Sequence, residues 1–277
     1  MTSASGAPSR IPCEMGRPRG EGCGHWLDGA VSAPLELRID DGLARITFDR
    51  PDKLNAFDAE LAEAWRDATR TATTTAGVGA ILLAGRGRAF CAGGDVRAMK
   101  DLPGSRLSDL ADVINEGLLA LLESDIPVVA AAHGTTAGGG LGVLLASDYA
   151  IVGADSRLGS LYANVGLTPD LSVSALLSDA VGERRALQLV LTDRMLTADE
   201  ALDWGLVAEV VDPADVLTRA EQVAQSWLSG ATLAYGQAKR LIRSRRSRTL
   251  AEQLAEEGRT IGAALDGDEG RSRVAAF

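Results

Sequence analysis

Cysteine and histidine are scarce in this sequence. Its 277 residues include 3 cysteines, Cys13, Cys23 and Cys91, and only 2 histidines. An odd and sparse set of cysteines does not make the disulfide framework on which small secreted domains depend. Cys13, Cys23 and His25 are neighbours in the chain, but their spacing matches no zinc-ligand pattern. We therefore expect neither a structural disulfide nor a bound metal.

A long apolar run and an excess of positive charge are also missing. The sequence has no stretch of 18 apolar residues, so it predicts no membrane-spanning helix. Its N-terminus does not place an apolar segment after a charged one, unlike a secretory signal. A formal net charge of -10 argues against nucleic acid or an anionic membrane as the main partner, although a few local cations could still bind a small anion. These absences predict a cytoplasmic protein.

Aromatic residues are few, and the N-terminal segment has no apolar periodicity. Aromatics make up 4% of the chain and hydrophobic residues 46%, which predicts a sizeable aliphatic core. Residues 1–33 are rich in Gly, Pro, Ser and Arg, which is typical of a disordered extension. The same composition fits a reading frame that is extended too far upstream, with Met15 or a later codon as the true start.

The remainder of the chain alternates strand and helix patterns. Apolar residues alternate with polar ones on both sides of Asp40-Asp41-Gly42, which predicts a β-hairpin. Apolar runs predict buried strands over 80–84 and 127–132, and helical spacing predicts helices over 57–71, 107–124 and 139–146. We therefore predict an α/β core of mostly parallel strands over residues 34–210, followed by a helical region over 211–277.

Two glycine-rich turns stand out within the predicted core. Ala92-Gly93-Gly94-Asp95 follows the apolar run that ends at Ala84, and Gly138-Gly139-Gly140 follows the run that ends at Ala132. Each sequence reads as a strand, a turn and then a helix, so backbone N–H groups are left unpaired at the turn. Two converging N–H groups can stabilise a carbonyl oxygen that becomes negative during a reaction. The pattern thus predicts an oxyanion hole, unless the glycines only permit close packing.

The order of several motifs resembles the crotonase (enoyl-CoA hydratase/isomerase) superfamily from about Leu35 to Phe277. The matching segments are 49–56, 87–95, 127–134, 137–140, 166–170, 196–201 and 204–211. The resemblance implies the ββα superhelix of the ClpP/crotonase fold, with an oligomerisation region over 211–277. It also implies a homotrimer or a dimer of trimers, and an acyl-CoA thioester as the ligand. No separate cofactor is expected, because coenzyme A is part of the substrate.

The resemblance also implies a set of site residues. The backbone N–H groups of Gly94 and Gly139 would form the oxyanion hole. The residues expected to contact the pantetheine, adenine or phosphates of coenzyme A are Ala92, Gly94, Asp95, Val96, Arg97, Lys53 and Lys239. For Asp95, an alternative is that its side chain only braces the turn, and for the lysines, that they are ordinary surface charges.

Hydratases of this family use two glutamates, and both are absent here. The matching positions are Gly142 and Tyr162, and neither glycine nor a phenol replaces a carboxylate base at neutral pH. Tyr162 is expected to fill the space of the missing side chain, and its alternative role is to form a hydrogen bond with the acyl group. Asp170 is the one carboxylate left in the right region, and some isomerases of the family carry an acid/base aspartate there. Its alternative role is to cap the following helix.

The sequence therefore supports three hypotheses. The leading hypothesis is an enoyl-CoA isomerase, in which Asp170 moves a proton from one carbon to another and the glycine N–H groups stabilise the enolate. The second is another crotonase reaction, such as hydration, thioester hydrolysis or decarboxylation. The third is a catalytically silent acyl-CoA-binding subunit. Leu171 and Ser172 replace the glycine pair that usually follows the isomerase aspartate, so the acyl pocket is expected to differ.

Overall fold

The computed structural model describes residues 33–277, and the predicted N-terminal extension lies outside them. The larger of two sheets has the strand order β1-β2-β3-β5-β7-β10. Its strands are β1 (Leu35–Asp40), β2 (Leu43–Phe48), β3 (Ala80–Gly85), β5 (Val128–Ala132), β7 (Tyr149–Gly153) and β10 (Glu209–Val211). Only β1 and β2 pair in antiparallel fashion, and all other neighbours are parallel. The predicted hairpin and parallel core are therefore confirmed.

A second sheet of very short strands lies at the carboxyl ends of the core strands. Its order is β4 (Ala89–Cys91), β6 (Thr135–Ala137), β8 (Arg157–Gly159) and β9 (Met195–Thr197). The first three strands are parallel, and β9 runs antiparallel to β8. Three-residue strands show no alternation in sequence, and this sheet was not predicted. Two of its strands, β4 and β6, lead into the two glycine turns.

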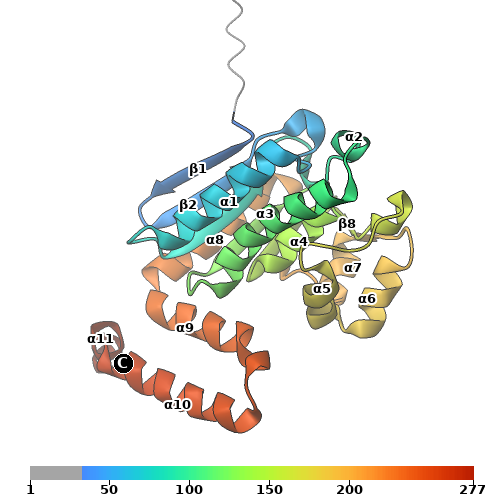
Figure 1. The fold of residues 1–277 in the computed structure, drawn as a ribbon. Coiled ribbons are helices and arrows are strands. Elements are labelled where there is room, and N and C mark those ends of the chain that lie inside the picture. The colour runs from blue at the N-terminus through green and yellow to red at the C-terminus, as the bar shows by residue number, and fades with distance from the viewer. Residues whose placement is uncertain (1–32) are drawn as a thin grey trace, which may run out of the picture. The chain divides into compact units, whose positions relative to one another are not determined.

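Helices cover both faces of the larger sheet (Figure 1). On one face, α1 (Ala59–Thr74) packs against α3 (Gly104–Glu123), and α4 (Gly139–Ala146) is buried along its whole length. On the other face, α8 (Val216–Ser229) packs against β3 and β5 and covers a separate apolar cluster. The predicted helix bounds agree to within a few residues, and Asp58 caps α1 as expected by accepting the Leu61 N–H at 3.1 Å.

The few aromatic side chains are concentrated at one place in the core. Phe48 stacks on Trp65 with ring centroids 5.6 Å apart, and it meets Phe57 and Phe90 edge-on at 5.7 Å each. The Trp65 indole N–H donates to the Ile114 carbonyl of α3 at 3.2 Å, so the buried polar atom is satisfied. This cluster fixes the segment before the first glycine turn against α1 and α3. Elsewhere the core is mainly aliphatic, although Tyr149 and Trp227 meet edge-on at 6.4 Å beside the cluster under α8.

The remaining helices complete the chain. They are α2 (Val96–Met99), α5 (Val173–Val181), α6 (Glu183–Val190), α7 (Ala198–Asp203), α9 (Thr232–Arg243), α10 (Leu250–Asp266) and α11 (Asp268–Ala276). In Figure 1, α10 and α11 lie apart from the sheets, and neither helix contains a buried residue. The domain boundary at residue 210 stays a prediction, since α8, which follows it, packs on the core sheet. None of the helices within 33–277 is long and apolar enough to cross a membrane.

Candidate active site

The first glycine turn connects β4 to α2. Gly93 has φ +102°, a conformation that favours glycine. On either side of Gly94, the Phe57 N–H donates to the Gly93 carbonyl at 2.7 Å and the Asp95 N–H donates to the Phe57 carbonyl at 2.8 Å. Among residues 33–277, no acceptor pairs with the Gly94 N–H itself. The turn is therefore held firmly while one donor stays free.

The side chain of Asn55 holds the strand that leads into this turn. It is fully buried and its side-chain amide donates to the carbonyls of Ala89 at 2.8 Å and Phe90 at 3.1 Å, both in β4. Its side-chain oxygen accepts the Arg50 N–H at 2.8 Å. Every polar atom of the buried amide thus has a partner, which fixes the position of the strand that enters the turn.

The second glycine turn connects β6 to α4. Gly138 has φ +51°, and its N–H donates to the carbonyls of Gly159 and Ser160 at 3.1 Å each. Gly139 is the first residue of α4, so its N–H has no acceptor within the helix. The positive end of the buried helix lies at the same place, which favours a developing negative charge.

The two turns pack directly against each other. A Cβ added to Gly93 would lie 2.9 Å from the Ala137 carbonyl oxygen and 3.3 Å from the Gly139 nitrogen. A Cβ added to Gly138 would lie 3.6 Å from Gly93 Cα. A side chain at Gly93 would push the turns apart, so this glycine is explained by close packing, and at Gly138 the positive φ favours glycine. Gly94 and Gly139 line the same cavity, as the oxyanion-hole prediction requires.

That cavity has a volume of about 490 Å³ and mostly apolar walls. Its lining includes Leu107, Leu110 and Ile114 of α3 and most residues of the segment 160–171. Asp170 is the only charged side chain among the lining residues that the structure describes. A site of this kind can accept an apolar acyl group and place one carboxylate beside it.

Tyr162 and Asp170 are joined by a short hydrogen bond. The Tyr162 hydroxyl donates to Asp170 Oδ1 at 2.5 Å. Desolvation by the cavity wall raises the pKa of the Asp170 carboxyl, and the bond from Tyr162 opposes that rise. Desolvation and the nearby Asp170 charge raise the pKa of Tyr162, so the phenol stays a donor at neutral pH. Tyr162 therefore does more than fill space, which sequence reasoning missed. The carboxylate of Asp170 does not cap α5, because Ser172 occupies the N-cap position without a side-chain bond.

Position 142, where a hydratase glutamate would lie, is closed by the chain itself. A Cβ added to Gly142 would lie 2.2 Å from the Leu171 carbonyl oxygen and 3.0 Å from Leu171 Cβ. Leu171 also approaches Gly139, where an added Cβ would meet Leu171 Cδ1 at 2.6 Å. The segment that carries Asp170 thus rests directly on the glycine face of α4. The sequence indicated that the pocket differs at Leu171 and Ser172 but did not predict this contact, which depends on their left-handed conformation, at φ 47° and 66°.

The predicted coenzyme A contacts fall into two groups near the first turn. Ala92 and Val96 line the cavity together with Gly94, whereas Asp95, Arg97 and Lys53 do not. Asp95 braces the turn, since it caps α2 by accepting the N–H groups of Arg97 at 3.1 Å and Ala98 at 3.2 Å. Lys53 pairs with Asp95 at 3.4 Å. Desolvation raises the pKa of the Asp95 carboxyl, but these bonds together bring it below its ordinary value.

The placement of Lys239 contradicts its predicted contact with a coenzyme A phosphate. Its side chain is buried, with 8% of the residue exposed, and the ammonium donates to the carbonyls of Leu121 at 2.8 Å and Ile126 at 2.7 Å. It also pairs with Asp148 at 2.9 Å. Desolvation lowers the pKa of Lys239, although the Asp148 charge opposes this. Lys239 therefore anchors α9 to the core, and no free ammonium is left to bind phosphate.

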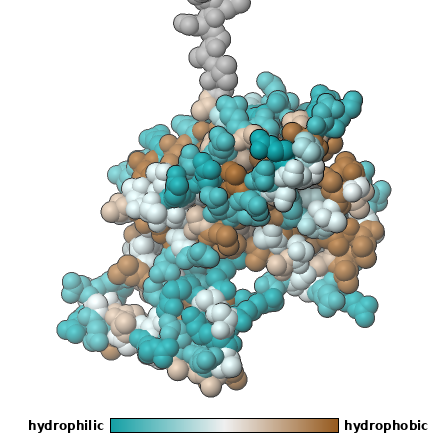
Figure 2. All heavy atoms as spheres, in the orientation of Figure 1, coloured by the Kyte–Doolittle hydropathy of each residue, from teal (hydrophilic) through white to brown (hydrophobic). Residues whose placement is uncertain are grey.

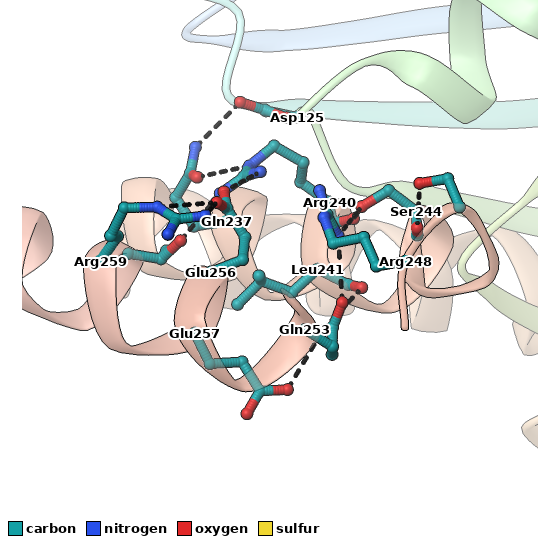
Figure 3. Close-up of polar contacts among 12 residues, drawn as sticks. Asp125, Gln237, Arg240, Leu241, Ser244, Arg248, Gln253, Glu256, Glu257 and Arg259 are labelled. Atoms are coloured by element: carbon teal, nitrogen blue, oxygen red, sulfur yellow. Dashed lines mark hydrogen bonds and ion pairs between the residues drawn. The ribbon is translucent and has the colours of Figure 1, made fainter. Parts of the chain in front are cut away.

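The other basic residues near Lys239 are also paired within the chain. Figure 3 shows Arg240 between the partners Gln237 and Glu256, and Arg248 beside Ser244 and Gln253. Each of these bonds is between 2.8 and 3.0 Å long. The charges that a phosphate would need are thus already neutralised or hydrogen-bonded by α9 and α10.

No cluster of three or more metal-ligating side chains occurs within the described part of the chain. Cys13, Cys23 and His25 lie outside it. Cys91 is buried beneath the first glycine turn, and burial raises the pKa of its thiol to about 12. It is a packed, neutral side chain at physiological pH, as its apolar neighbours in sequence suggest.

Comparisons with known proteins agree with this architecture. The family profile described as "Enoyl-CoA hydratase/isomerase" matches residues 38–277. The chain is 34% identical to 4-chlorobenzoyl coenzyme A dehalogenase-2 from Arthrobacter sp over 249 residues, which cover 88% of this chain and 90% of that protein. It is 31% identical to 1,2-epoxyphenylacetyl-CoA isomerase from Escherichia coli, with 86% and 93% of the two chains covered.

A solved structure gives the same result for the fold. An enoyl-CoA hydratase from Mycobacterium smegmatis superposes with a TM-score of 0.83 at 27% identity, covering 88% of this chain and 95% of that chain. The predicted crotonase fold is confirmed. By its sequence, its fold and the glycine turns that meet at its cavity, the chain belongs to the enoyl-CoA hydratase/isomerase family.

Proposed function

We propose that this protein is an enoyl-CoA isomerase that shifts a double bond with a single carboxylate. The observation that carries the proposal is the position of Asp170, which among residues 33–277 is the only charged side chain lining the cavity that Gly94 and Gly139 also line. A double-bond shift needs one group that removes a proton and returns it, and it needs no bound water. The site offers one such group.

The proposed reaction has two proton transfers. Asp170 removes a proton from C2 of a 3-enoyl thioester, and the electron pair moves into the carbonyl to give a dienolate. The N–H groups of Gly94 and Gly139 stabilise the oxygen as it becomes negative, each contributing roughly 3 kcal/mol to the transition state. Asp170 then returns the proton to C4, the carbonyl re-forms, and the product is the conjugated 2-enoyl thioester.

The relatives support an acyl-CoA substrate and leave the reaction open. Their names include an isomerase and a dehalogenase, and a short-chain-enoyl-CoA hydratase from Clostridium acetobutylicum is 30% identical over 245 residues. Hydration is disfavoured here because positions 142 and 162 carry no carboxylate, and the space beside Gly142 is taken by Leu171. Isomerisation is the reaction that the remaining side chains support best.

The test is turnover of a 3-enoyl-CoA, followed by the absorbance of the conjugated product. We expect turnover by the wild type and a loss of at least about 100-fold in Asp170→Asn. Asp193→Asn, at an exposed position outside the cavity, is the matched control and should behave as the wild type. An Asp170→Asn variant as fast as the wild type would contradict the mechanism.

A substrate panel separates the alternatives. Water addition to crotonyl-CoA, thiol release from acyl-CoA, decarboxylation of a malonyl-type thioester and chloride release from 4-chlorobenzoyl-CoA are measured beside isomerisation. Any one of these proceeding faster than isomerisation would replace the proposal. Tight thioester binding without turnover across the panel would identify a silent binding subunit.

We further propose that the protein assembles through its C-terminal helices, as a trimer or a dimer of trimers. Apolar side chains on α10 that are between 52% and 76% exposed recur at helical spacing: Leu250, Leu254, Ile261 and Leu265. In Figure 2 this region is mostly hydrophilic with small brown spots, and the larger brown areas lie on the core. Such a stripe on an otherwise polar helix is typical of an interface between subunits. Sedimentation velocity of the purified protein tests the assembly.

A further inference from the structure

Tyr162 is held rigidly beside the second glycine turn. It begins the short helix η2 (Tyr162–Val165), and its carbonyl accepts the Leu167 N–H at 3.0 Å, which closes the segment on itself. Its ring packs partly against the main core, and a Cβ added to Gly138 would lie 3.9 Å from Tyr162 Cζ. The hydroxyl therefore has a fixed position next to the turn that carries Gly139.

The hydroxyl holds only one of the two oxygens of Asp170. Oδ1 accepts the Tyr162 hydroxyl at 2.5 Å, and no other side chain within residues 33–277 forms a hydrogen bond or ion pair with this carboxylate. Rotation of the carboxylate about its terminal bond is thereby restricted, because a charge-assisted bond of this length is directional. Oδ2 has no side-chain partner among these residues and can contact a ligand.

Within the part of the chain that the structure describes, Tyr162 is also the only ionisable side chain that lines the cavity besides Asp170. No lysine, arginine, histidine or glutamate of that part lines it, from α3, from the two turns or from the segment 160–171. Cys91, which also acts on the pKa of Tyr162, is a neutral thiol with a pKa of about 12. Desolvation raises the pKa of the Asp170 carboxyl, and Tyr162 is the side chain that lowers it again.

We propose that Tyr162 is a positioning residue, whose hydroxyl fixes Oδ1 of Asp170 and presents Oδ2 to the substrate carbon. The inference rests on the proposed function, in which Asp170 transfers the proton. It assigns to Tyr162, at the position of a hydratase glutamate, the task of orienting a different carboxylate eight residues further along the chain.

The test replaces Tyr162 with phenylalanine, which keeps the ring and removes only the hydroxyl. Tyr149→Phe is a matched control, because Tyr149 donates a similar bond of 2.7 Å to Glu209, between β7 and β10 and outside the cavity. We expect kcat for the 3-enoyl-CoA to fall about tenfold or more in Tyr162→Phe, with KM nearly unchanged. The acid limb of the kcat/KM profile should move to higher pH. Tyr149→Phe should change neither quantity.

A second measurement does not depend on turnover. The Asp170 carboxyl is titrated by carbon-13 NMR of aspartate-labelled protein, with its signal assigned from its absence in Asp170→Asn. We expect a higher pKa for this carboxyl in Tyr162→Phe than in the wild type. An unchanged titration, or an unchanged acid limb with kcat intact, would overturn the inference. A shifted titration in a protein that isomerises nothing would refute the proposed function and leave the contact between Tyr162 and Asp170 established.

Discussion

A single methyl group at Gly142 is expected to have a large effect. Gly142 lies in α4, where every residue is buried, and an added Cβ would lie 2.2 Å from the Leu171 carbonyl oxygen. A carbon and a carbonyl oxygen approach to about 3.3 Å in proteins, so the methyl group and Leu171 must separate by roughly 1 Å. The contact is with backbone, which cannot rotate away like the end of a side chain.

The segment around Leu171 is the part that should move. The helix α4 is enclosed by core residues on all sides, whereas Leu171 and Ser172 lie in a connecting segment at positive φ. Overpacking of a buried site costs about 1–3 kcal/mol, so Gly142→Ala should lower the free energy of unfolding by about 2 kcal/mol. The shift also displaces Asp170, the neighbour of Leu171. A misplacement of about 1 Å can lower the rate of a positioned reaction about 100-fold.

The assay combines thermal unfolding with kcat for the 3-enoyl-CoA. Gly262→Ala is the matched control, because Gly262 lies in α10 away from the proposed interface stripe, and no atom of residues 33–277 lies within 4 Å of an added Cβ there. We expect it to match the wild type in activity and to be no less stable. A Gly142→Ala protein with the melting temperature and kcat of the wild type would refute the reasoning about Leu171. Efficient hydration of crotonyl-CoA by the double variant Gly142→Glu/Tyr162→Glu would refute it as well, because a glutamate at 142 would also collide with the Leu171 carbonyl.

Three further predictions concern separate parts of the chain. Lys239→Met should lower the free energy of unfolding by about 3 kcal/mol in a denaturant titration, because it leaves the partly buried Asp148 without one of its cations; an unchanged midpoint would contradict the anchoring role. Asp170→Asn should melt above the wild type at pH 7. The folded carboxyl has a raised pKa, so the wild type loses stability as pH rises through that pKa, and the difference between the two proteins should vanish in acid. Ile261→Asp in α10 should reduce the sedimentation coefficient, whereas Leu191→Asp, at a position also more than 70% exposed, should not; equal behaviour would argue against α10 as the interface.

Elements that depend on interactions between residues near in sequence could be predicted. Asp58 indicates the start of α1, because an N-cap side chain bonds within the first turn of its helix. The run from Gly139 to Ala146 has no polar face, because α4 is buried on all sides. The glycine turns were predictable for a similar reason, since Gly93 and Gly138 need conformations that other residues avoid. The resemblance to a known family then related these turns to a common site.

Features that depend on distant contacts were not predictable in this way. A lysine on a helix normally has its ammonium in water, so nothing at Lys239 indicated that the carbonyls of Leu121 and Ile126, more than a hundred positions earlier, would surround it. The short strands of the second sheet are extended because they pair with one another, and their own residues show no strand pattern. The bond between Tyr162 and Asp170 depends on a segment whose direction changes at two left-handed residues, and no periodicity describes such a path.

The absence of the two glutamates and the position of Asp170 depend on each other through the packing of the segment 166–172. A side chain at position 142 would occupy the space in which the Leu171 carbonyl lies, and without that space the segment 166–172 could not rest on α4. The residue at position 162 supplies the hydroxyl that holds Asp170 once the segment is there. Restoring either glutamate alone would therefore remove a support of Asp170 without recreating a hydratase. The residues at 142, 162 and 170 consequently act as a set, and non-additive effects of their substitutions are expected, as for any groups that share one packed site.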